Sequence, residues 1–463
     1  MKHILITLIL ITLLGSCTSA ANETDTATKY GSLSVPENRN DPSSRLIRLS
    51  YAVVRAKIRS DRPPIVFIQG GPGGSSLAMV SFFENNPLSE KQDVILFDAR
   101  GTGRSGAFCE EAGGDFIRLM AKDLSVEEEY QETLAICEAC KEEIAETEAD
   151  LAGYNSLENA ADLEALREHL KVDKWVLFGG SYGTRLGLTY LREYEDAAEA
   201  AIFMGLFPPE INIYEGFLSG LNGALEHLFA SCLNDPDCKE KYPDLETSFH
   251  AMMDNLKEKP LSVRYKSSEF VINPQDALLL IHQMLYQRQT IQEVPSFITA
   301  LKDGKKGSVI TSSINRTEQT FAFINAATYW SVQANEEVQF NEANIIQKQL
   351  PAFNHLMPGP AFFINDQQIL DNWHEFRSSE IENEAVLTAT PILIVNGMFD
   401  PITPMENARK VLEYLPNASL AEFPNDGHTI FNPCFFDLVE SFVANEYKAP
   451  KASCVVDGTL NWR

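Results

Sequence analysis

The sequence places a serine where it could act as a nucleophile. Ser181 is the central residue of a G-x-S-x-G pattern at residues 179–183 (GGSYG). An apolar run at 174–178 precedes the pattern, and helical periodicity at 182–192 follows it. A strand, a sharp turn and a helix in this order expose a serine hydroxyl on a strained turn. The same five residues also fit an ordinary glycine-rich turn, so the hypothesis needs a general base and an acid elsewhere in the chain.

Two later residues are predicted to complete this chemistry. Asp400 follows an apolar strand pattern in residues 391–404 (PILIVNGMFDPITP), and His428 follows a short strand pattern in residues 419–429. A histidine can accept the serine proton, and an aspartate can hold the imidazole in the required tautomer. The order Ser, Asp, His is the chain order of α/β-hydrolases, whose sites lie at the carboxyl ends of parallel strands. Ser181, Asp400 and His428 are therefore the predicted catalytic residues.

Each assignment has an alternative in the sequence. Asp400 precedes Pro401 and could be a turn residue, while Asp426 is closer to His428 along the chain. Asp400 and His428 are preferred because each directly follows a strand pattern. Five other histidines follow Ser181, all in helical or mixed segments where core or surface positions are common: His227, His250, His282, His355 and His374.

Backbone amides near the serine are predicted to bind the oxyanion of a tetrahedral intermediate. Residues 64–74 (PIVFIQGGPGG) form a strand pattern that ends in a glycine-rich turn. In α/β-hydrolases one donor is the residue after the nucleophile and the other comes from such a turn. The predicted donors are the amides of Tyr182 and Gly71.

Taken together, these motifs resemble the prolyl/tripeptidyl aminopeptidase type of α/β-hydrolase. The resemblance covers about 30–209 and 386–463 and is carried by residues 31–56, GGPGG at 70–74, DARGTGRS at 98–105, 154–170, 179–194 and GMFDPITP at 397–404. It implies a serine peptidase that releases N-terminal residues or short peptides from a peptide substrate with a free N-terminus. An acyl-enzyme would form, and no metal or organic cofactor would be needed.

Substrate recognition is less defined by the sequence. Gln69 stands where proline iminopeptidases commonly carry histidine, which puts strict proline specificity in doubt. Glu210 and Glu215 are candidates for binding the substrate ammonium group, although either could be an ordinary surface acid. The alternatives are an esterase acting on small carboxylic esters and a catalytically inert peptide-binding lipoprotein.

The chain length and its periodicity predict how these residues are positioned. With 463 residues, 44% of them hydrophobic, the chain can bury a large core. Apolar runs alternate with helical patterns, which predicts an α/β-hydrolase fold with a mostly parallel sheet flanked by helices. Residues 30–209 and 386–463 would form this core. Predicted strands include 46–54, 65–69, 94–97, 175–178, 200–204 and 392–395.

Residues 210–385 differ in character because they are rich in amphipathic helical patterns. We expect them to form a largely helical lid, inserted after the sixth strand and lying over Ser181. The alternative is a packing appendage with no effect on selectivity.

The amino terminus predicts export. Residues 1–17 combine a basic start, an eleven-residue apolar run at 4–14 and the sequence LGSC, which resembles a bacterial lipobox. The protein would then be lipid-anchored through Cys17 to a bacterial membrane, facing the periplasm or the cell exterior. Residues 18–29 would be a flexible tether. The alternative is an ordinary secretory signal.

Cysteines and charge narrow the remaining possibilities. Cys232 with Cys238 and Cys434 with Cys454 are predicted disulfides, while Cys109 could pair with either Cys137 or Cys140. The sequence does not favour a structural zinc site, because such a site would need a second pair of cysteines. The formal charge of −27 argues against nucleic acid as a partner and favours cationic substrates.

Overall fold

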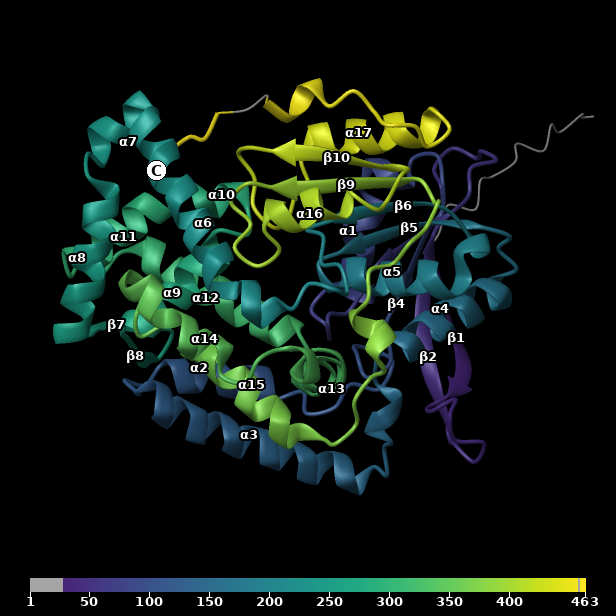
Figure 1. The fold of residues 1–463 in the computed structure, drawn as a ribbon, viewed down its shortest axis with the longest axis horizontal. Coiled ribbons are helices and arrows are strands. Elements are labelled where there is room, and N and C mark those ends of the chain that lie inside the picture. Colours follow the sequence, from purple (N-terminus) through teal and green to yellow (C-terminus); the bar gives the residue numbers. More distant parts are fainter. Residues whose placement is uncertain (1–27, 457–458) are drawn as a thin grey trace, which may run out of the picture.

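The computed structural model describes residues 28–456 and 459–463 (Figure 1). The predicted signal peptide, Cys17 and most of the predicted tether lie outside the described residues. Lys29 already belongs to a strand.

An eight-stranded sheet forms the centre of the molecule. Its strand order is β1-β2-β4-β3-β5-β6-β9-β10; β1 and β2 pair antiparallel, as do β2 and β4, and the remaining pairs are parallel. β3 and β4 are buried along their whole length, because helices cover both faces of a parallel sheet. This architecture confirms the predicted fold class. The strands are β1 (Lys29–Pro36), β2 (Leu46–Val54), β3 (Ile65–Ile68), β4 (Val94–Phe97), β5 (Trp175–Gly180), β6 (Ala198–Met204), β9 (Ile392–Gly397) and β10 (Ala418–Phe423).

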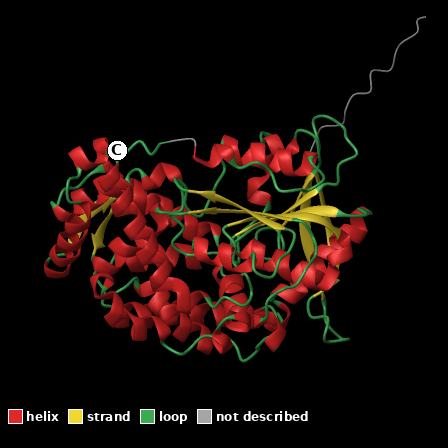
Figure 2. Ribbon diagram, turned by 45° about the horizontal axis from the view of Figure 1, so that its top comes forward, coloured by secondary structure: helices red, strands yellow, loops and turns green. Residues whose placement is uncertain are grey.

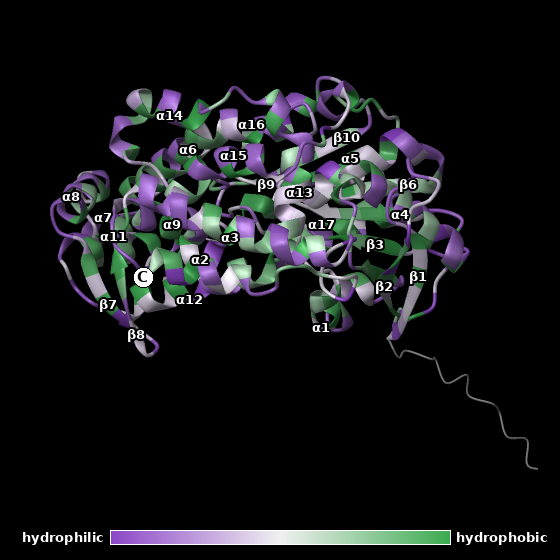
Figure 3. Ribbon diagram, turned by 90° about the horizontal axis from the view of Figure 1, so that it is seen from below, coloured by the Kyte–Doolittle hydropathy of each residue, from purple (hydrophilic) through white to green (hydrophobic). Residues whose placement is uncertain are grey.

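Helices pack on both faces of the sheet (Figure 2). One face is covered by α4 (Ser156–Leu170), α5 (Tyr182–Tyr194) and α16 (Met405–Val411), whose apolar residues join one core cluster. The other face is covered by α1 (Val80–Glu84) and α17 (Pro433–Ala444). Figure 3 shows hydrophobic residues along β3 in the interior. Among the described residues, no helix combines the length and apolar character needed to cross a membrane.

The chain between β6 and β9 forms a large, mostly helical insertion beside the sheet (Figure 1). Its residues share a separate hydrophobic core. Its elements are α6 (Ile213–Asn234), α7 (Pro236–Lys241), α8 (Leu245–Glu258), β7 (Leu261–Tyr265), β8 (Ser268–Ile272), α9 (Pro274–Met284), α10 (Arg288–Ile291), α11 (Val294–Lys302), α12 (Ser308–Phe323), α13 (Ala326–Glu336), α14 (Ile345–Gln349) and α15 (Ala361–Trp373).

Two helices from outside the insertion join this second core. α2 (Ala112–Met120) and α3 (Val126–Glu146) lie between β4 and β5 in sequence, but α2 packs against α12 and α3 against α15. The predicted division assigned these residues to the sheet core. In the structure their apolar side chains pack with those of the insertion.

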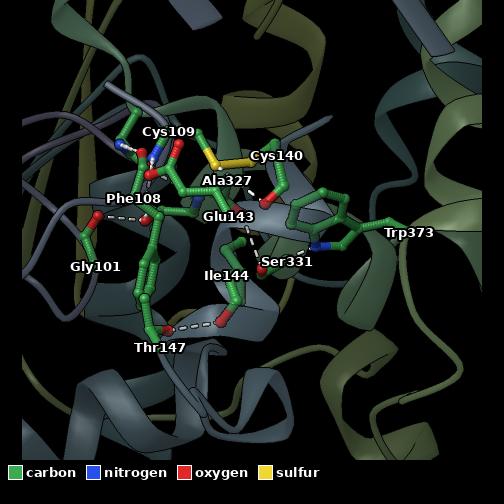
Figure 4. Close-up of a disulfide and its surroundings, with 12 residues drawn as sticks. Gly101, Phe108, Cys109, Cys140, Glu143, Ile144, Thr147, Ala327, Ser331 and Trp373 are labelled. Carbon is green, nitrogen blue, oxygen red and sulfur yellow. Dashed lines mark hydrogen bonds between the residues drawn. A yellow bond between two sulfur atoms is a disulfide. The ribbon is translucent and has the colours of Figure 1, made fainter. Parts of the chain in front are cut away.

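Three disulfides link segments of the described chain. Cys232–Cys238 and Cys434–Cys454 form as predicted. Cys109 pairs with Cys140, one of its two possible partners. Figure 4 shows this bridge beside Glu143, whose carboxylate accepts a hydrogen bond from the Cys109 N–H at 2.9 Å. Cys137 is a buried free thiol, and burial raises its pKa to about 12.

Candidate active site

Ser181 sits on a strained turn between β5 and α5. Its backbone has φ 54° and ψ −125°, a conformation that non-glycine residues rarely adopt. The turn requires glycine nearby, since a Cβ on Gly183 would lie 2.1 Å from the Ile68 carbonyl oxygen. The strand, turn and helix expected around Ser181 are therefore present.

Asp400 and His428 come together from the loops after β9 and β10. Nδ1 of His428 lies 2.8 Å from Oδ2 of Asp400, and both side chains are buried. The imidazole can thus donate its Nδ1 proton to Asp400, which leaves Nε2 free to accept a proton.

Four donors hold the Asp400 carboxylate in place. Oδ1 accepts the backbone N–H groups of Ile402 and Thr403 at 3.0 and 2.9 Å. Oδ2 accepts the Thr403 hydroxyl at 2.6 Å in addition to the histidine. Hydrogen bonds of this kind stabilise the ionised carboxylate and fix its orientation. Thr403 lies in the GMFDPITP segment, but sequence analysis assigned it no role.

The alternative partner of His428 is engaged elsewhere. Asp426 forms an ion pair with Arg288 of α10 and accepts a hydrogen bond from Asn432 at 3.2 Å. Of the five alternative histidines, His282 alone is fully buried. Burial lowers its pKa to about 3, so it is neutral at physiological pH. None of the five lines the cavity described next.

Ser181 and His428 line one cavity of about 370 Å³ between the sheet and the insertion. Gly71 and Tyr182 line it as well, so four of the predicted site residues meet there. Many residues of the wall are aromatic: Phe67, Phe116, Phe178, Phe207, Phe321, Phe323, Phe362, Phe363, Phe431, Tyr286, Tyr329 and Trp330. Apart from His428, its polar side chains are amides and hydroxyls, and no aspartate or glutamate of the described chain lines it.

The backbone at Tyr182 and at Gly71 is suited to the predicted role of their N–H groups as oxyanion donors. Tyr182 is the first residue of α5, where a backbone N–H has no acceptor within the helix. Gly71 has φ 125°, and a Cβ there would lie 2.8 Å from the Gly73 nitrogen. The insertion holds this turn, because the Asn325 N–H donates to the Gly73 carbonyl at 2.9 Å.

The insertion also contacts the histidine loop. The Tyr286 carbonyl accepts the Thr429 N–H at 2.8 Å, and the Tyr286 ring centroid lies 4.7 Å from that of His428. The helical segment therefore forms part of the wall around the reacting groups.

Glu210 and Glu215 do not reach the cavity. Glu210 accepts a hydrogen bond from the Tyr414 hydroxyl, and Glu215 is exposed at the start of α6. Neither lines the cavity, whereas Gln69 does. A residue's place at the start of the insertion did not indicate which way its side chain faces.

The DARGTGRS motif has a structural role. Asp98 accepts hydrogen bonds from the Ser75 hydroxyl at 2.8 Å and the Arg104 N–H at 2.8 Å. The buried Arg100 donates twice to Asp162, at 2.8 Å each. These bonds organise the loop after β4.

The chain is similar to several known proteins. The family described as alpha/beta hydrolase fold matches residues 63–432. The chain is 24% identical to the proline iminopeptidase of Arabidopsis thaliana over 389 residues, 84% of this chain and 74% of that protein. It is 24% identical to the proline iminopeptidase of Xanthomonas citri over 370 residues, 80% of this chain and 84% of that protein.

Two further likenesses are more limited. The serine protease Hip1 of Mycobacterium tuberculosis is 29% identical over 222 residues, 45% of this chain and 42% of that protein. Among solved structures, an esterase from Exiguobacterium antarcticum covers 88% of this chain and 98% of its own, with 14% identity and a TM-score of 0.38.

Proposed function

The chain belongs to the alpha/beta hydrolase fold family, and on that premise we propose that it is a serine aminopeptidase. It would release N-terminal residues or short peptides from peptides with a free N-terminus. The observation that carries this proposal is the arrangement of Asp400 and His428, 2.8 Å apart, with His428 and Ser181 on one cavity. The similarity to proline iminopeptidases supports peptide substrates.

The proposed mechanism uses only groups of this chain. His428 accepts the Ser181 proton through Nε2 as the hydroxyl oxygen attacks the scissile carbonyl. Asp400 keeps the Nδ1 proton in place and stabilises the imidazolium. The amides of Gly71 and Tyr182 stabilise the oxyanion, and each such donor is commonly worth about 3–4 kcal/mol of barrier.

The second half of the reaction reverses the proton transfer. His428 protonates the leaving amine, which departs and leaves an ester between the acyl group and Ser181. The histidine then activates a water molecule that hydrolyses this ester. The enclosing insertion limits access by bulk water and acts as the lid, which strengthens every electrostatic interaction inside.

One observation favours an esterase as the second candidate. The cavity wall is rich in aromatic side chains, its polar side chains other than His428 are amides and hydroxyls, and no aspartate or glutamate of the described chain lines it. Such a wall suits an uncharged acyl group as well as an apolar peptide.

A substrate comparison separates these two functions. Protein lacking residues 1–17 would be assayed on aminoacyl and tripeptidyl amides, their N-acetylated forms and short-chain esters, with Ser181→Ala as the control. An aminopeptidase will turn over the free-amine amides and reject the acetylated ones. Indifference to acetylation with esters preferred would contradict the aminopeptidase and favour the esterase.

We also propose that the protein is exported and lipid-anchored through Cys17. Its three disulfides support an oxidising compartment. Cys17→Ser should release the protein from membranes into the soluble fraction. Unchanged membrane retention of this variant would contradict the anchor.

A further inference from the structure

Asp366 is a buried carboxylate without a counter-ion in the described chain. It lies on α15 and is 3% exposed. Its Oδ2 accepts hydrogen bonds from the hydroxyls of Tyr214 and Tyr329, the latter at 2.7 Å. Among the described residues, no lysine, arginine or histidine forms an ion pair with it. Burying such a charge is unfavourable, so its retention suggests a use.

Apart from the catalytic Asp400, the other buried carboxylates of the described chain have a cation or lie away from the catalytic cavity. Asp162 pairs with Arg100, and Glu336 pairs with Arg185. Glu129 is also buried without a cation, but it lines a separate space of about 20 Å³ and accepts a hydrogen bond from Gln275 at 3.0 Å. Asp366 differs from these three because Tyr329, which donates to it, lines the catalytic cavity.

Asp366 lies directly behind that wall. Tyr329, which donates to it, lines the cavity that Ser181 and His428 share. Phe362 and Phe363, one turn earlier on α15, line the same cavity. Gln333 lies one turn after Tyr329 on α13 and lines the same cavity.

The side chains of Asp366, Tyr329 and Gln333 together have the chemistry needed to bind a primary ammonium group. Because the Tyr329 hydroxyl donates its proton to Asp366, its oxygen lone pairs remain available to accept from a cation in the cavity. The Gln333 amide oxygen is a second acceptor. The carboxylate behind them supplies a full negative charge in a surrounding of low polarity, where attraction to a cation is much stronger than in water.

We propose that Asp366, through Tyr329 and with Gln333, forms the subsite that receives the α-ammonium group of the peptide substrate. This inference rests on the proposed aminopeptidase function. It also explains how a cavity that no aspartate or glutamate of the described residues lines can prefer a cationic substrate. Burial raises the pKa of Asp366 to about 6, so the group is mostly ionised at neutral pH.

The test is the variant Asp366→Asn, which keeps a side-chain oxygen for the two tyrosines but removes the charge. Its kcat/KM for a free-amine tripeptidyl amide should fall roughly 10- to 100-fold, as expected for a lost hydrogen-bonded charge. The loss should lie in KM. The ratio of its kcat/KM for the free-amine amide to that for a short-chain ester without an amine should therefore fall as well.

Glu129→Gln is the matched control, because it neutralises a buried carboxylate outside the catalytic cavity. It should leave the preference for free amines unaltered. An equal loss on both substrates in Asp366→Asn, or no loss on either, would overturn the proposal. If the wild type itself accepts acetylated and free peptides equally, this result contradicts the aminopeptidase function and therefore also the subsite that rests on it.

A second variant covers the case in which Asp366→Asn does not fold. Tyr329→Phe keeps the carboxylate but removes the hydroxyl that donates to it. In a Ser181→Ala background, calorimetry should show that it binds the free-amine tripeptidyl amide at least about tenfold more weakly than the parent. Equal binding by the two proteins would overturn the proposed subsite.

Discussion

Gly205 provides the space that the His428 imidazole occupies. A Cβ on Gly205 would lie 2.9 Å from both Nδ1 and Cε1 of the ring, and Gly205 has φ 63°. Its N–H donates to the Val395 carbonyl at 3.1 Å, which fixes the backbone behind the histidine. The position of the general base therefore depends on a residue that carries no side chain.

Gly205→Ala should shift the imidazole and reduce kcat about 10- to 100-fold, because a displacement near 1 Å can cost about 100-fold in rate. The left-handed backbone should add a destabilisation of about 1–2 kcal/mol. Steady-state kinetics and urea unfolding measure the two effects. Gly216→Ala on α6 is the control, since a Cβ there meets nothing within 4 Å and should leave kcat unaltered. Wild-type kcat in Gly205→Ala would contradict the described packing.

Thr403→Val should lower kcat about tenfold or more. The variant keeps the side-chain shape but loses the hydroxyl that donates to Asp400 at 2.6 Å. Thr403→Ser retains that hydroxyl and should restore most of the rate. A serine variant as slow as the valine variant would show that the hydroxyl is not what matters.

Arg185→Leu should destabilise the protein by about 3–5 kcal/mol, since it leaves buried carboxylates without their cation. Arg185 is buried on α5 and binds Glu336 at 3.1 Å and Glu337 at 2.8 Å, which joins the helix after Ser181 to the insertion. Urea unfolding gives the loss.

The exposed ion pair of Arg118 with Asp115 provides the control for Arg185. The Arg118 side chain is 63% exposed, so Arg118→Ala should cost less than about 1 kcal/mol. Similar losses in the two variants would contradict the role given to Arg185.

Glu129→Gln should make stability less dependent on pH. Burial raises the pKa of Glu129 from 4.5 to about 7, so the folded protein favours the protonated form. The stability that the folded protein gains from protonating Glu129 is fully present below pH 4.5 and is lost as the pH rises through 7. Between pH 5 and pH 8 the wild type should therefore lose about 2–3 kcal/mol relative to the variant. If wild type and Glu129→Gln differ in unfolding free energy by the same amount at pH 5 and at pH 8, this prediction is wrong.

The local parts of the site could be predicted from sequence because each follows from a short pattern. Apolar strand patterns end just before Ser181 and near Asp400 and His428, and parallel strands bring their carboxyl ends to one edge of the sheet. The glycine-rich turn around Gly71 was visible for the same reason. These features depend on residues that are neighbours along the chain.

The remaining features depend on contacts between distant segments. Tyr329 and Asp366 are brought together by the packing of α13 and α15, which no local pattern encodes. The choice of Cys140 over Cys137 for Cys109 likewise depends on which side of α3 faces the loop after β4. Amphipathic periodicity predicted the helices of the insertion but not their neighbours.

The most direct test of the account is to identify the residue that reacts with a fluorophosphonate, a reagent that phosphonylates activated serines. Intact mass spectrometry should show one adduct per chain, and peptide mapping should place it on Ser181. Ser181→Ala should gain no adduct and lose turnover while keeping its melting temperature. An adduct on another residue, or turnover that persists in pure Ser181→Ala protein, would contradict the assignment of Ser181 as the nucleophile.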